Sequence, residues 1–134
     1  MPVTTASTSV LCTDPPRNWT LTYDARPWTM NERIHHYERA RRTEEWRDAF
    51  RMLALEAKVP KLDRIAVVVT TTLRKKVSRD VAAEMPAAKA AIDGLVDAGI
   101  IPNDTPAHLV RLTFEAPVLG AEGDSLVLTI EAVA

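Results

Sequence analysis

The chain has 134 residues, 46% of them hydrophobic and 26% charged, which suits one globular domain and is too short for two. The net charge of −1 excludes nucleic-acid binding through an overall positive field, so any such binding requires local basic patches. No apolar segment approaches the length of a membrane span, and the N-terminal sequence lacks the blocks of a signal peptide. The lone Cys12 excludes an internal disulfide, so we expect a cytoplasmic protein with no membrane partner.

The first part of the chain divides into an arm and the start of a domain. Residues 1–17 are rich in threonine, serine and proline, which predicts a flexible N-terminal arm, and residues 18–134 form the predicted domain. Trp19, Leu21 and Tyr23 alternate with threonines, a pattern typical of a short, half-buried strand.

Residues 31–58 have a helical pattern whose apolar stripe is interrupted. One face carries an apolar stripe at helical spacing: Trp46, Phe50, Leu53 and Ala57. Ile34 and Tyr37 lie well around the helical wheel from that stripe, so one straight helix cannot bury both sets. We therefore expect the main helix to begin at Thr43, whose hydroxyl can cap the first turn. The basic segment 26–42 is then a surface loop or short helix and a candidate binding loop.

Two adjacent histidines and three tryptophans are candidates for metal binding and base stacking, respectively. His35 and His36 are expected to point in different directions and lack further ligands at metal spacing, so we expect solvated or DNA-facing histidines rather than a zinc site. The tryptophans at positions 19, 28 and 46 are expected in the core or a dimer interface rather than as platforms for base stacking, although Trp28 fits either role.

The remaining elements alternate in type. Residues 65–71 are apolar on both faces, which predicts a central strand. A helix follows, with Pro86 in its first turn and Gly99 at its end, and its buried stripe is Ala88, Ile92 and Leu95. Residues 110–114 and 126–130 predict two further strands. The order β-α-β-α-β-β predicts a single α/β domain with a mixed sheet.

Charged residues follow the central strand. Arg74, Lys75, Lys76 and Arg79 form a basic run, and Asp80 and Glu84 come next. Lys89 lies in the following helix and Asp104 in the turn after it. The carboxylates of Asp80 and Asp104 can converge across the helix, and two carboxylates are a minimal ligand set for Mg²⁺. A bound Mg²⁺ can activate water for phosphodiester hydrolysis. Spacing alone favours the structural alternatives, in which Asp104 is a turn residue and Lys89 pairs with Asp93 on the helix surface.

A resemblance to a known family favours the metal site over the structural alternatives. RusA-like Holliday junction resolvases carry Arg-Asp-x-Asp-Asn, then a lysine, Asp-x-Leu, Ala-Gly and a closing acidic pair. The segment RDVAAEMPAAKAAIDGLVDAGIIPND is similar to that signature. The matching residues are Arg79, Asp80, Lys89, Asp93, Leu95, Ala98, Gly99 and Asp104. Residues 20–47 also resemble the family's N-terminal part, in which a strand leads to a proline-containing loop with an asparagine, here Asn31.

The resemblance implies a homodimer that binds four-way DNA junctions and nicks them with Mg²⁺ (or Mn²⁺). It implies Asp80, Lys89 and Asp104 as catalytic residues, with Asp80 and Asp104 as metal ligands. Glu84 is the only nearby acid that can compensate for a missing ligand. The implied contacts to DNA phosphates are Asn31, Arg33, Arg74, Lys75, Lys76 and Arg79.

The chain departs from the family at the metal site. Ala82 and Ala83 stand where the family has its second aspartate and the adjoining asparagine, and Asn103 replaces the first acid of the closing pair. Fewer carboxylates weaken metal binding and leave the bound water less activated. The expected function is therefore a Mg²⁺-dependent junction endonuclease of impaired activity, with a catalytically inactive DNA-binding or regulatory protein as the alternative. An interaction module that binds no nucleic acid is a third possibility.

Overall fold

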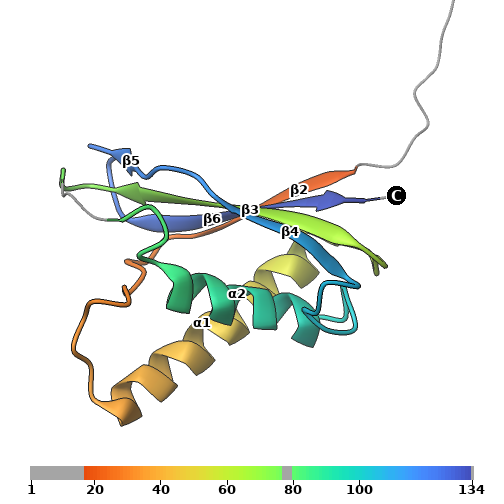
Figure 1. Cartoon of the computed structure of the whole chain (residues 1–134), viewed down its shortest axis with the longest axis horizontal. Helices are drawn as coiled ribbons and strands as arrows, with labels where there is room; N and C mark the ends of the chain where they lie inside the picture. The colour runs from red at the N-terminus through yellow and green to blue at the C-terminus, as the bar shows by residue number, and fades with distance from the viewer. Residues whose placement is uncertain (1–16, 77–79, 134) are drawn as a thin grey trace, which may run out of the picture.

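The computed structural model describes residues 17–76 and 80–133, which form one mixed sheet and two helices (Figure 1). The elements are β2 Asn18–Tyr23, α1 His36–Glu56, β3 Ile65–Leu73, α2 Met85–Asp97, β4 Leu109–Phe114, β5 Val118–Leu119 and β6 Ser125–Ala132. The predicted single α/β domain with a mixed sheet is confirmed, with the short β5 added to the expected order. The predicted arm lies outside the described residues except for Arg17, as does the predicted phosphate contact Arg79.

The central position predicted for the strand at residues 65–71 is confirmed. The strand order is β2-β6-β3-β4, and β5 also pairs with β3, beyond the end of β4. β6 runs antiparallel to β2 and β3, whereas β4 and β5 run parallel to β3. Both helices lie on the same side of the sheet (Figure 1). The opposite face of β3 is therefore only partly covered, and Val68 on that face is half-buried.

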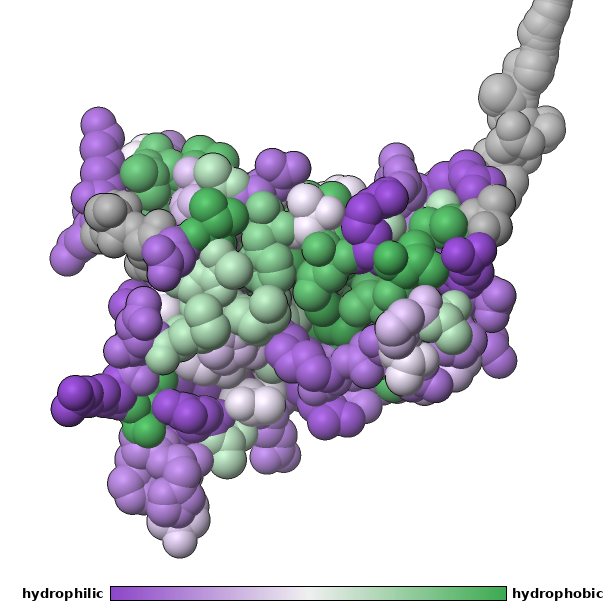
Figure 2. All heavy atoms as spheres, in the orientation of Figure 1, coloured by the Kyte–Doolittle hydropathy of each residue, from purple (hydrophilic) through white to green (hydrophobic). Residues whose placement is uncertain are grey.

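The core lies between the sheet and the helices. Val67, Leu128 and Ile130 on the sheet are fully buried and pack in one cluster with Trp46 and Phe50 of α1. The expectation that the tryptophans are structural is confirmed in part, because Trp28 and Trp46 are each only 2% exposed and their rings meet edge to face. Figure 2 shows apolar side chains gathered over α2 and β4 on this view, while the projecting start of α1 is mostly hydrophilic.

The predicted start of the first helix was wrong. α1 begins at His36, and Thr43 lies inside it, where its hydroxyl donates to the Arg39 carbonyl. His35 is the N-cap, and its Nδ1 accepts from the Tyr37 backbone N–H at 3.3 Å. The first turns need no buried stripe because ion pairs on one helix face stabilise them. Glu38 accepts from Arg41 at 2.6 Å and from Arg42 at 3.1 Å.

The second helix follows its sequence signals. Pro86 lies in its first turn, and Gly99 after its end adopts a φ of +82°, so both predictions are confirmed. α2 packs against α1 at Gly94, where an added Cβ would lie 2.4 Å from the Arg47 carbonyl oxygen. The guanidinium of Arg47 forms a bidentate pair with Asp97, with one bond of 2.8 Å, and this pair joins the two helices at the surface.

Candidate functional site

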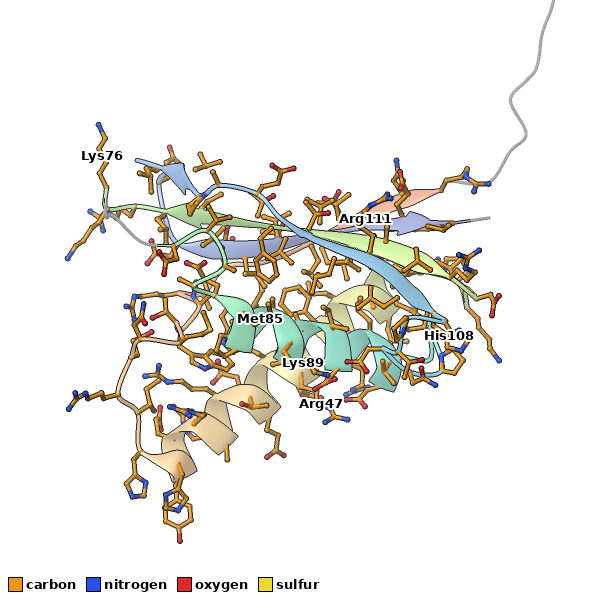
Figure 3. The ribbon with its side chains drawn as sticks, viewed as in Figure 1. Arg47, Lys76, Met85, Lys89, His108 and Arg111 are labelled. Atoms are coloured by element: carbon orange, nitrogen blue, oxygen red, sulfur yellow. The ribbon has the colours of Figure 1, made fainter. Side chains whose placement is uncertain are left out.

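Lys89 is the centre of a small charged cluster on the outer side of α2. Its Nζ donates to Asp93 Oδ1 at 2.9 Å and also to Asp104 Oδ2. Asp93 lies one turn further along α2, and Asp104 comes from the turn that follows the helix. Figure 3 shows Lys89 on the side of α2 that faces away from the sheet. Two of the three predicted catalytic residues, Lys89 and Asp104, are therefore in contact.

The contacts of Lys89 shift two of the pKa values in this cluster. The hydrogen bonds to Asp104 and Asp93 raise the pKa of Lys89 above its usual range. The hydrogen bond from Lys89 lowers the pKa of Asp104 below its usual range. Each partner thus stabilises the ionised form of the other. Lys89 as found is an ion-pair partner rather than a proton donor or acceptor poised near pH 7.

We expect Asp104→Asn to lower the free energy of unfolding at pH 7 by less than about 1 kcal/mol, because the pair with Lys89 is partly exposed. A carboxyl group whose folded pKa is lowered stabilises the fold above its unfolded pKa, and the effect is lost as the pH falls through the folded value. The difference from wild type should therefore shrink as the pH falls below the ordinary pKa of 3.8 and vanish only below the lowered pKa of the folded state. Urea unfolding at pH 7 and pH 3 measures it.

Asp24→Asn is the matched control, because Asp24 is exposed and has no ion pair within the described residues. If Asp104→Asn and Asp24→Asn change stability equally at both pH values, the contact between Lys89 and Asp104 does not persist in solution.

The predicted metal ligands occupy different environments. Asp80 is exposed just before α2, and its carbonyl accepts from the Ala83 N–H, whereas Glu84 is only 1% exposed. Within residues 17–76 and 80–133, no three His, Cys, Asp or Glu side chains come close enough together to hold one ion. As arranged, these residues do not fit Mg²⁺, which prefers several oxygen ligands. The ligand roles of Asp80, Glu84 and Asp104 remain predictions.

The two alanines that depart from the family pattern lie in the turn before α2. Ala82 is half-buried and Ala83 is fully buried. The Ala83 carbonyl accepts from the Met30 N–H at 2.9 Å, which fastens the loop after β2 to the start of α2. The candidate binding loop therefore lies beside the predicted catalytic segment, a proximity that only the tertiary structure reveals.

The end of the sheet carries three of the six predicted phosphate contacts, Arg74, Lys75 and Lys76. A cleft of about 690 Å³ lies at the ends of β2 and β3 and the start of β6. Three cations line it, Arg26, Arg74 and Lys75, together with three acids, Asp24, Glu122 and Asp124. Sequence reasoning missed these acids, because they come from segments far apart in the chain. Lys76, next to the cleft, points away from the body of the protein (Figure 3).

The basic side chains divide into paired and unpaired sets. Arginines along α1 are neutralised by nearby acids: Arg41, Arg42, Arg47 and Arg51. In the described part of the chain, five of the predicted or neighbouring cations have no acidic side-chain partner: Arg33, Arg39, Arg74, Lys75 and Lys76. Asn31 is exposed on the same loop as Arg33. All five of these cations are exposed.

No protein-family model and no curated protein matches the sequence. The resemblance to RusA-like resolvases therefore remains a hypothesis drawn from the sequence. Neither α1 nor α2 combines the length and the apolar character that crossing a bilayer requires.

Proposed function

We propose that the protein binds branched DNA through its backbone phosphates and cleaves it weakly or not at all. The observation that carries this proposal is the separation of the cations into two sets. Four of the five arginines of α1 pair with neighbouring acids, and Arg26 on the loop before it pairs with Glu32. Within the described residues, Arg33, Arg39 and the cations after β3 have no acidic side-chain partner. Exposed Lys and Arg side chains without acidic partners can replace the counterions of DNA, which makes binding favourable and dependent on salt.

The loop before α1 approaches both the start of α2 and the basic segment after β3, because its Arg26 lines the same cleft as Arg74 and Lys75. The Met30–Ala83 hydrogen bond joins this loop to the start of α2. Arg39 of α1 and Pro86 of α2 line the same cavity, of about 220 Å³. Asp80 follows the basic run and lies in the same part of the fold. A DNA backbone that contacts both segments would therefore pass close to the residues that the resemblance assigns to catalysis.

A Mg²⁺-dependent junction endonuclease is the second candidate function. The contact between Lys89 and Asp104 favours it, because the resemblance places both residues in one catalytic site. Against it, both nearby carboxylates are engaged by Lys89, and Ala82 and Ala83 supply no ligand. In either function a homodimer would match the two symmetric strands of a four-way junction.

The test compares two double variants with equal loss of charge in titrations of a labelled four-way junction and a linear duplex. We expect Lys75→Gln/Lys76→Gln to weaken junction binding several-fold and to reduce the slope of log K against log salt by about two. The control is Lys58→Gln/Lys61→Gln, because these exposed lysines precede β3 and lie at its opposite end. The control should bind like wild type.

The same titrations can contradict the proposal. Wild-type protein that shows no preference for the junction over duplex at low salt does not have the proposed function. Equal losses in the two double variants would mean that only net charge matters and that the basic run after β3 is no binding site. Nicking of the junction with Mg²⁺ or Mn²⁺ measures the second candidate function directly.

A further inference from the structure

Three aromatic rings form an exposed stack at the start of α1. The ring centroids of His35 and His36 are 4.4 Å apart at an interplanar angle of 28°. Tyr37 lies 4.1 Å from His36 and 5.1 Å from His35, and it is 74% exposed. The expectation that the two histidines point in different directions was therefore wrong.

This stack lies at a projecting tip rather than on the body of the protein. The start of α1 is the part of the helix farthest from the sheet (Figure 1). The buried residues of α1 are Trp46, Phe50 and Ala54, so nothing in its first ten residues contributes to the core. These rings are exposed and have no role in the core, so their faces are accessible to a partner.

Two arginines flank the rings. Arg33 and Arg39 are exposed, and neither has an acidic partner among the residues that the structure describes. Arg39 also lines the cavity beside Pro86, which connects the tip to the start of α2. Proteins that hold single-stranded nucleic acid combine these two features, since aromatic faces stack on bases while nearby cations contact the backbone.

We infer that the tip formed by Arg33, His35, His36, Tyr37 and Arg39 stacks on bases that lack a stacking neighbour. In a four-way junction the bases stay paired, but stacking is interrupted where strands exchange, so the tip would contact the branch point while the cations after β3 contact the arms. The inference rests on the proposed function and adds to it the part of the DNA that is recognised. Paired bases in a continuous duplex are already stacked and offer the rings no free face.

The experiment uses four-way junctions that carry the fluorescent base 2-aminopurine either at the branch point or within an arm. We expect wild-type protein at saturation to change the fluorescence of the branch-point probe and not that of the arm probe. His36→Ala/Tyr37→Ala should lose this change and bind single-stranded oligonucleotide about tenfold more weakly, with little change in salt dependence. The matched control is Met52→Ala/Leu55→Ala, which removes two exposed apolar side chains from the same helix.

The outcomes separate this inference from the proposed function. If the ring variant binds the junction and changes branch-point fluorescence as wild type does, the tip makes no contact with bases and the inference is overturned, while the proposed function stands. If wild type shows no junction preference yet binds single-stranded oligonucleotide, and the ring variant loses that binding, the proposed function fails and the tip is supported. Wild type that binds neither overturns both. Thermal unfolding of each variant verifies that it is folded.

Discussion

Replacing Gly94 with alanine is expected to lower the free energy of unfolding by about 1–3 kcal/mol, the usual range for overpacking. An added Cβ would lie 2.4 Å from the Arg47 carbonyl oxygen and 3.0 Å from the Arg51 nitrogen. Both are backbone atoms of α1, so no change of side-chain rotamer can relieve the contact. The helices must move apart, which disturbs the core around Phe50.

The sign of this effect is diagnostic. In an exposed helix interior, alanine is favoured over glycine by about 1 kcal/mol, so Gly94→Ala would stabilise a helix that packed against nothing at this point. Urea unfolding of wild type and variant at pH 7 measures the difference. Gly123→Ala is the matched control, because its added Cβ meets nothing within 4 Å and its φ is not positive. A Gly94→Ala protein at least as stable as wild type would contradict the close approach of the helices.

The strands were predictable from sequence because one face of each packs against the helices. In β6, the residues Leu126, Leu128 and Ile130 are buried and alternate with less buried neighbours, and this alternation is visible in the sequence. β5 was not predictable, because two residues carry no periodicity. It forms only because the chain after β4 continues along the edge of β3.

The start of α1 was missed because the sequence reading relied on a buried stripe. The first turns of this helix are solvated and are held by local ion pairs instead. The sequence does contain a signal for them, since Glu38 precedes Arg41 and Arg42 by three and four residues. Reading these charge pairs as helix-forming would have moved the predicted start close to His36.

The candidate site was predictable only where its residues are close in sequence or in the family signature. The pair of Lys89 with Asp93 follows from helical spacing. The resemblance placed Lys89 and Asp104 in one site, although it did not predict the direct contact that the structure shows between them. The acids of the cleft at the end of the sheet were not predictable in this way. Asp24 and Asp124 come together because β2 and β6 pair in a register that sequence patterns do not specify.

The second large effect is expected from Ala82→Asp. This variant should nick a four-way junction in the presence of Mg²⁺, whereas the wild-type chain should nick it feebly or not at all. The substitution adds a carboxylate two residues after Asp80 in the turn before α2. Ala82 is half-buried, so the new side chain can reach solvent from this turn. A further carboxylate beside Asp80 makes binding of a hard divalent cation more favourable.

Ala83→Asn, the other change toward the family pattern, should be made separately. Ala83 is fully buried and its carbonyl is bonded to Met30, so an amide side chain there would lose its contacts with water. A buried polar group without partners costs about 1–3 kcal/mol, and a combined variant that failed to cleave could simply be less stable. Ala82→Asp alone avoids this ambiguity.

The nicking assay includes two control variants. Ala82→Asn has nearly the size of aspartate without its charge, so it should stay as inactive as wild type if a cation is what the carboxylate recruits. Asp80→Asn in the Ala82→Asp background should remove the gained activity if both carboxylates hold the same ion. Brisk nicking by wild type that survives Asp80→Asn would show that Asp80 is no metal ligand. If a folded Ala82→Asp protein binds the junction without nicking it, the missing carboxylate is not the reason that the chain fails to cleave. That result would favour a protein that binds DNA and does not cut it.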